Sequence, residues 1–515
     1  MLRLPPAARA ASGAGGRAMT GPTGVRPCRD RERSLRLALV LGIAFSVPCQ
    51  VTGQSYRGWL SSSVHMVEVR PVGVDSLARA EVVTDAEGRD LFDGYRVTCR
   101  DDICTGLLPL PKERTFAVTQ DASVTYWGLG VQGLSATGLV RARTGFGGEA
   151  AWPRHDDRFD AMLAYAQLVR GSFRLRAGRQ EIRSGLGFAS FDGVSGSYDR
   201  DRLRAGIYGG RSLARGLREP SNVAARALDD FFVDQGVYLI GGAATVRKFG
   251  VSMTGRYHRE ILADRSGLES ERASLDLSTT LPRMRVRGSI DYDFAFQRTG
   301  KGEITVSAPF ADGTWLVELG GRRYVPYFQL STIWGFFEPV SYSEARARLA
   351  WSGSPTVGVW VAGGARAYGD TETGIFLSPL EDTGWRADGG VRWEPVDRWS
   401  VDARYELEWG SGAFLNSADV STRYRPLDRL GLGVTFATFQ QIEEYRLGQG
   451  RAFGFGGTVD YAIGERIDAF GGFSMTRHRD GGNIHTSPWN QTRAWTSLRW
   501  AVGRDPGQAN RGGRR

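Results

Sequence analysis

The most restrictive feature of this sequence is the stretch Arg283–Gln297, RMRVRGSIDYDFAFQ, in which polar and apolar side chains alternate. Odd-numbered positions carry mostly Arg and Asp, whereas even-numbered positions are apolar and end in aromatic residues. Because successive side chains of a strand point to opposite faces, the pattern predicts a strand with one charged and one apolar face. Its length exceeds the usual five or six residues and suits a tilted strand that crosses a membrane.

Similar alternating segments, separated by turn residues, recur from Phe116 almost to the end of the chain. Pro, Gly and Asp mark short turns, which alternate with longer polar loops, as in membrane barrels with short turns on one side. We count strands from Asp121 and add Arg57–Val72, because such barrels have an even number of strands. The prediction is an all-β fold with one large antiparallel up-and-down transmembrane β-barrel of about 22 strands, within a range of 18–24, over residues 116–502. The expected long loops are 144–157, 214–235, 263–270, 326–341, 370–383, 441–451 and 477–492.

Composition agrees with a barrel and excludes other classes. Beyond residue 50 there is no run of about 18 apolar residues, so the sequence predicts no membrane-spanning helix. Gly is frequent, at 69 of 515 residues, and hydrophobic residues make up 41%. The net charge is +10, but residues 1–53 hold eight Arg against Asp30 and Glu32. The other basic residues are dispersed, so we expect no nucleic-acid partner.

The N-terminal residues 1–53 are predicted to be a cleavable signal peptide. An apolar core, Leu37–Val47, follows several Arg residues and is too short to span a bilayer. The small residues that end at Gly53 favour Gln54 as the first residue after cleavage. Cys49 suggests lipid attachment as an alternative, which the preceding Pro48 disfavours. We therefore expect export and location in the outer membrane of a Gram-negative bacterium.

Cys99 and Cys104 are the cysteines that remain after such cleavage. In an oxidising compartment we expect them to form a disulfide that closes a small polar loop. The even strand count favours residues 54–115 as a first strand followed by a long disulfide-bearing loop. A small N-terminal segment that lies in the periplasm or fills the lumen is the alternative. Residues 503–515, rich in Gly and Arg, are predicted to be a disordered tail.

Charged residues on the predicted inner faces are the candidates for pore selectivity, because rings of both signs filter solutes. The alternative is that they simply pair across a filled barrel. The candidate lumen-lining residues are Arg174, Arg176, Arg283, Arg285, Arg287, Asp291, Asp293, Asp402, Arg404, Glu406, Glu408 and Arg499.

The sequence offers little support for enzymatic chemistry. The five His residues are scattered and form neither a HExxH motif nor a His-x-His pair. His155 and His485 fall in predicted outer loops, where a hydrolase site at the barrel rim would lie. We expect solvated loop residues there, and we predict no catalytic residue, no metal site and no cofactor.

Two segments resemble known outer-membrane barrels. The last strand, Gln491–Val502, is similar to the C-terminal signal that such barrels present to the barrel-assembly machinery, although Gly503–Arg515 follows it. Phe173–Gly187 and the following Phe191-Asp192-Gly193-Val194 resemble the Gly-Arg-Gln strand and loop of porin-like exporters of the alginate-export type. That resemblance implies a passive diffusion channel with an Arg-lined interior. A TonB-dependent receptor would need a plug of well over 100 residues, and only about 60 lie between the expected cleavage site and the start of the regular pattern.

The sequence therefore favours a porin-like channel in outer-membrane lipid that passes small hydrophilic solutes. One alternative is a surface or adhesion barrel with an occluded lumen, and a rim hydrolase is the least favoured. A homotrimer is an alternative to a monomer, since protomers in a trimer hide an apolar flank between them.

Overall fold

The structure is a computed structural model that describes residues 55–70, 72–85, 88–92, 95–147, 159–213, 236–263, 267–325, 341–369, 382–410, 414–441, 450–480 and 489–503. The expected signal peptide 1–53, all but the first residue of the tail 503–515, and His155 and His485 lie outside these residues. Within the described ranges, no helix is both long and apolar enough to cross a membrane.

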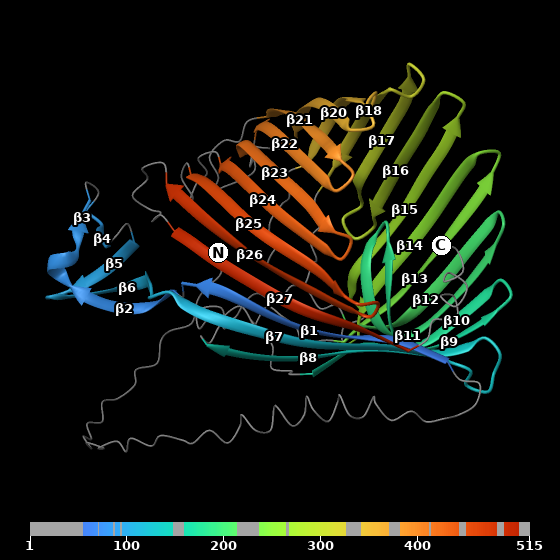
Figure 1. The fold of residues 1–515 in the computed structure, drawn as a ribbon, viewed down its shortest axis with the longest axis horizontal. Helices are drawn as coiled ribbons and strands as arrows, with labels where there is room; N and C mark the ends of the chain where they lie inside the picture. Colours follow the sequence, from blue (N-terminus) through green and yellow to red (C-terminus); the bar gives the residue numbers. More distant parts are fainter. Residues whose placement is uncertain are drawn as a thin grey trace, which may run out of the picture. The chain divides into compact units, whose positions relative to one another are not determined.

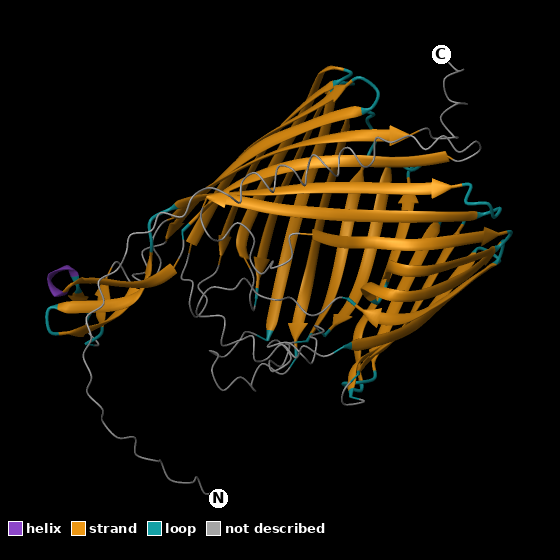
Figure 2. Ribbon diagram, turned by 90° about the horizontal axis from the view of Figure 1, so that it is seen from below, coloured by secondary structure: helices purple, strands orange, loops and turns teal. Residues whose placement is uncertain are grey.

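Twenty-two antiparallel strands form one closed sheet (Figures 1 and 2). Each strand pairs with the next along the chain, and β1 closes the barrel by pairing with β7 on one side and β27 on the other. The predicted all-β barrel of about 22 strands is thus confirmed. Its strands are β1 (Ser55–Val69), β7 (Glu113–Trp127), β8 (Leu134–Gly147), β9 (Phe159–Arg170), β10 (Phe173–Ser184), β11 (Gly187–Arg200), β12 (Leu203–Ser212), β13 (Val237–Lys248), β14 (Val251–Leu262), β15 (Leu268–Leu281), β16 (Met284–Asp293), β17 (Arg298–Phe310), β18 (Trp315–Tyr324), β19 (Tyr342–Trp351), β20 (Val357–Tyr368), β21 (Thr383–Val396), β22 (Trp399–Trp409), β23 (Phe414–Leu427), β24 (Leu430–Gln441), β25 (Gly450–Ile463), β26 (Ile467–Asp480) and β27 (Trp489–Gly503).

Large apolar side chains are exposed on the outer face of this sheet, whereas the opposite face is mainly polar. The alternation follows from the strand geometry, which sends neighbouring side chains to opposite faces. A soluble sheet would bury its apolar face, so the exposed belt indicates an apolar surrounding. Examples of exposed outer residues are Phe173, Leu175, Ile207, Ile240, Ile290, Ile304 and Leu319.

The strand that the sequence placed at 283–297 is shorter in the structure. β16 covers Met284–Asp293, and the next four residues form a turn that leads directly into β17 at Arg298. The Asp293 carboxylate accepts hydrogen bonds from the backbone N–H groups of Ala295 and Phe296, at 3.0 and 3.2 Å. Aspartate often stabilises a turn in this way, and the bonds explain why the strand ends before the aromatic residues do.

The segment predicted as a long loop contains a second, five-stranded sheet between β1 and β7. Its order is β2-β6-β5-β4-β3, and a short 3-10 helix, η1 (Arg79–Glu81), separates β2 from β3. Val97, Cys104 and Leu108 form its buried core, and a disulfide joins Cys104 to Cys99. The strands are β2 (Val72–Ala78), β3 (Val83–Thr84), β4 (Asp90–Phe92), β5 (Tyr95–Arg100) and β6 (Ile103–Pro109).

Candidate functional site

The predicted lumen residues of β16 lie on the face opposite the exposed apolar side chains. Arg285, Arg287 and Asp291 alternate with Ile290, which is 50% exposed on the outer face. Asp293 is buried at the end of the strand, where it holds the turn. The prediction that Arg283 begins this strand is wrong. β16 begins one residue later, and Arg283 lies in the turn before it.

The remaining candidates also lie opposite outward apolar residues. On β22, Asp402, Arg404, Glu406 and Glu408 alternate with a series that includes the exposed Tyr405. On β27, the Arg499 guanidinium stacks over the Trp59 ring of β1 at 4.8 Å from the ring centre. The structure therefore places the candidates at separate positions around the wall and does not gather them into one cluster.

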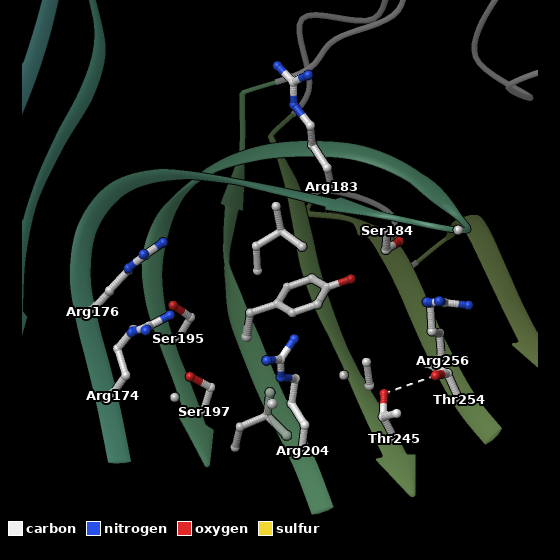
Figure 3. Close-up of a pocket in the computed structure, with 18 residues that line it drawn as sticks. Arg174, Arg176, Arg183, Ser184, Ser195, Ser197, Arg204, Thr245, Thr254 and Arg256 are labelled. Atoms are coloured by element: carbon white, nitrogen blue, oxygen red, sulfur yellow. Dashed lines mark hydrogen bonds between the residues drawn. The ribbon is translucent and has the colours of Figure 1, made fainter. Parts of the chain in front are cut away.

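Sequence reasoning missed the feature that shapes the interior, which is the end of the β10–β11 hairpin. We call residues 180–190 the inner hairpin. The pairing of β10 with β9 stops at Arg179, and the pairing of β11 with β12 starts at Phe191, so the intervening residues leave the wall. They bend over the inner face of the barrel, as the arching ribbon in Figure 3 shows.

Glycine permits this bend at its base. Gly178 has a φ of +120°, a conformation that other residues rarely adopt. A Cβ atom at Gly178 would lie 2.3 Å from the carbonyl oxygen of Ala164 on β9. Any larger residue would therefore both strain the backbone and push the two strands apart.

An apolar contact holds the inner hairpin against the wall. Phe191 has no exposed surface, and it packs with Ala189 and with Leu239 of β13. Partly buried Ile182 and Tyr208 complete this cluster. Nearby, the buried Gln180 side chain donates to the Gly193 carbonyl at 3.1 Å and accepts from the Ser195 hydroxyl at 2.5 Å.

The tip of the inner hairpin reaches across to β15. The Arg272 guanidinium donates to the Leu186 carbonyl at 3.0 Å and to the Asp291 carboxylate of β16 at 2.8 Å. The tip is thus fixed to the wall three strands beyond β12. These contacts make the inner hairpin a bridge inside the barrel.

A cavity of about 600 Å³ lies beneath the inner hairpin, against β12–β14. In Figure 3, Arg174 and Arg176 extend into it from β10, Arg204 rises from β12, and Arg256 enters from β14. Arg183 also borders the cavity but points away above the hairpin. The residues lining this cavity include five Arg and no Asp or Glu.

A second cavity, of about 610 Å³, adjoins β15–β18 and is lined by charged groups of both signs, with an excess of acidic ones. Asp276, Asp291, Glu303 and Glu318 line it together with Arg287 and Lys301. Gly185, at the tip of the inner hairpin, borders both cavities. The hairpin tip therefore lies between a basic and a mixed-charge region.

A third charged region covers the inner faces of β19–β22. Four Arg and four carboxylates form a connected set of ion pairs there, so their formal charges cancel. Asp388 is its most buried member, with a fully covered side chain 2.6 Å from Arg346. The set comprises Glu344, Arg346, Arg366, Arg386, Asp388, Arg404, Glu406 and Glu408.

Several of these residues escaped sequence reasoning for a simple reason. Arg204, Arg256 and Arg272 each look like an ordinary polar position of an alternating strand. Their importance comes from the inner hairpin. The sequence feature that could have indicated this hairpin is the two-residue turn Gly185-Leu186, which lies at the end of the barrel where most connections are long loops.

No protein-family profile matches the chain, and no curated protein matches it. Among solved structures, a BenF-like porin from Pseudomonas fluorescens Pf-5 is 11% identical, with a TM-score of 0.39, over 88% of this chain and 100% of the porin. OpdQ from Pseudomonas aeruginosa is 8% identical, with a TM-score of 0.38, over 87% and 99%. The siderophore receptor PirA from Acinetobacter baumannii is 9% identical, with a TM-score of 0.46, over 87% and 80%.

Proposed function

We propose that this protein is an outer-membrane channel through which small hydrophilic solutes pass passively. Support for a membrane location comes from the closed sheet, which leaves no strand edge unpaired, and from the exposed apolar belt outside it. Its strands contain ten to fifteen residues, enough to cross a bilayer when tilted. In this proposal the surrounding partner is lipid.

The observation that carries channel function is the polar, cavity-bearing inner face. Two cavities of about 600 Å³ flank the inner hairpin, and charged groups line both. A barrel filled for structural purposes alone would pair these charges completely, as the ion pairs of β19–β22 do. The unequal charge near the inner hairpin instead suits a solute path, where fixed charges filter what enters.

Conductance of the purified protein in planar lipid bilayers tests the proposal. We expect stepwise insertions, each with a current proportional to voltage. A bilayer that stays silent although the protein shows a heat-dependent shift in gel mobility would remove the channel function. The gel shift serves as the control, because it shows that the barrel is folded.

A surface role is the second candidate, and the five-stranded sheet favours it. Three apolar residues of that sheet are largely exposed, namely Val74, Ile103 and Leu107. Val74 of β2 lies directly opposite Leu107 of β6. Silent bilayers combined with a folded barrel would support this candidate. Substitution of the three residues by Ser should then weaken attachment to a surface and leave the gel shift unchanged.

A further inference from the structure

We propose that the cavity beneath the inner hairpin binds small oxyanionic solutes, through a carboxylate or phosphate group held by Arg174 and Arg176. The inference rests on the proposed channel function, because it names the class of solute that the lumen would retain. It is carried by an excess of positive charge, by the shape of the cavity floor and by the contrast with the neighbouring cavity.

The positive charge of Arg174 and Arg176 is not neutralised locally. Among the described residues, Arg174 forms neither a hydrogen bond nor an ion pair. Arg176 donates to the neutral Gln167 amide oxygen at 2.7 Å and lies over the Tyr165 ring at 5.1 Å. These neutral contacts orient the guanidinium and leave its charge available to a ligand.

Of the other three Arg residues that line the cavity, Arg183 points away from it (Figure 3), and the remaining two already have acidic partners. Arg204 pairs with Asp199 at 2.5 Å, and Arg256 pairs with Asp276. Asp199 also lies in the electrostatic field of Arg174. Four guanidinium groups thus face two carboxylates, which leaves an excess of two positive charges within one cavity. A bound anion would balance that excess.

The floor of the cavity provides room and a hydroxyl group. Ser197 lies directly opposite Arg174 in the β10–β11 register, and Gly206 lies beside Ser197 on β12. Gly206 also lines the cavity, and because it has no side chain it does not fill the space beside Ser197. An oxyanion there would accept hydrogen bonds from guanidinium groups and a hydroxyl together.

The ligand class follows from the geometry of arginine. A guanidinium group presents parallel N–H donors that match the paired oxygens of carboxylates and phosphates, whereas a halide ion offers no such match. The adjoining cavity contains Arg287, but four carboxylates line it as well. An anion should therefore settle beneath the inner hairpin and not in that neighbouring space.

Binding of inorganic phosphate and of acetate to the detergent-solubilised full-length protein tests the inference. We expect saturable binding of at least one probe by calorimetry at low ionic strength. Arg174→Gln and Arg176→Gln should each weaken it about tenfold, as expected for the loss of one charge-assisted hydrogen bond. Arg176→Lys should restore only part of the affinity, because lysine keeps the charge and loses the paired donors.

Arg287→Gln is the matched control, since it removes an inner-face Arg from the neighbouring cavity. It should keep the affinity of the unchanged protein within about twofold, as expected for a site that it does not contact. Equal weakening in Arg287→Gln would show a diffuse electrostatic effect and overturn the inference. Absence of saturable binding of both probes, in a protein that still shows the gel shift, would overturn it as well.

The two probes separate the two sources of the oxyanion. Tighter binding of acetate points to carboxylated solutes, and tighter binding of phosphate points to phosphorylated ones. Because binding is measured in detergent, its outcome is independent of conductance. A conducting protein that binds neither probe retains the channel function and loses this site, whereas a silent protein that binds retains the site and loses the channel function.

Discussion

At the scale of single residues, neighbouring positions on one strand face different surroundings. Ile290 of β16 is half exposed on the outer face, whereas Ser289 faces inward and donates to the Glu303 carboxylate at 3.1 Å. In a lipid bilayer the first position would contact acyl chains and the second would contact water. The same substitution should therefore have different effects at the two positions.

Ile290→Arg is expected to impair insertion into lipid. An Arg on the lipid face near the middle of the membrane costs about 2–4 kcal/mol. The measurement is the fraction of refolded protein that shows the heat-dependent gel shift after mixing with lipid vesicles, followed through a urea series.

Ser289→Arg is the control for this prediction, because it introduces the same side chain on the inner face beside Glu303. It should insert as efficiently as the unchanged protein. If both variants insert equally well, or if only Ser289→Arg fails, the assignment of inner and outer faces is wrong.

At the scale of elements, the inner hairpin is a part of the barrel that can loosen without opening the wall. The apolar cluster around Phe191 and the Arg272 contact hold it in place. The backbone pairing of β10 with β9 and of β11 with β12 involves other residues, which lie outside the inner hairpin. Local stability can differ in this way from the stability of the whole molecule.

Phe191→Ala is expected to release the inner hairpin and raise the single-channel conductance. Truncation of a fully buried Phe typically costs about 3–5 kcal/mol, which here would be lost mainly from the packing of the hairpin. Single-channel recording measures the effect, and the gel shift should persist.

Phe188→Ala is the matched control, because Phe188 belongs to the inner hairpin and is 52% exposed. Its conductance should equal that of the unchanged protein. Unchanged conductance in Phe191→Ala, with the variant folded, would mean that the inner hairpin does not restrict the path.

Alternation allowed the strands to be predicted, but it carries no information on where a hairpin leaves the wall. β16 illustrates both outcomes, since its faces follow the pattern and its end does not. That end depends on the two hydrogen bonds of Asp293, which periodicity cannot reveal. Likewise, Arg174 and Arg176 were recognisable as inner-face residues, whereas Arg204 and Arg256 became relevant only because the inner hairpin covers them.

At the scale of the whole molecule, closure depends on the pairing of β1 with β27. Ser63 of β1 lies directly opposite Ser497 of β27. Facing residues of antiparallel strands have Cα separations of about 4.5–5.5 Å, within the range that a disulfide can bridge.

The double substitution Ser63→Cys and Ser497→Cys is expected to form a disulfide across this pair in the folded protein. After boiling, the oxidised sample should migrate differently from the reduced one, because its chain ends are joined. Gel electrophoresis with and without reductant is the measurement.

Ser63→Cys combined with Arg493→Cys is the control, because Arg493 lies opposite Val67 and not Ser63. This pair should give no mobility difference. Crosslinking of the control to the same extent would contradict the register of β1 and β27.

The pairing of β1 with β27 also has a consequence for biogenesis. The two strands come from opposite ends of the described chain, so their contact is among the most distant in sequence. Contacts of this kind form slowly, because a long loop must close first. Until β27 is in place, the backbone N–H and C=O groups of β1 along that edge are unsatisfied, and such an edge can recruit a foreign strand. A nascent chain would therefore need a temporary partner for its first strand until its last one arrives.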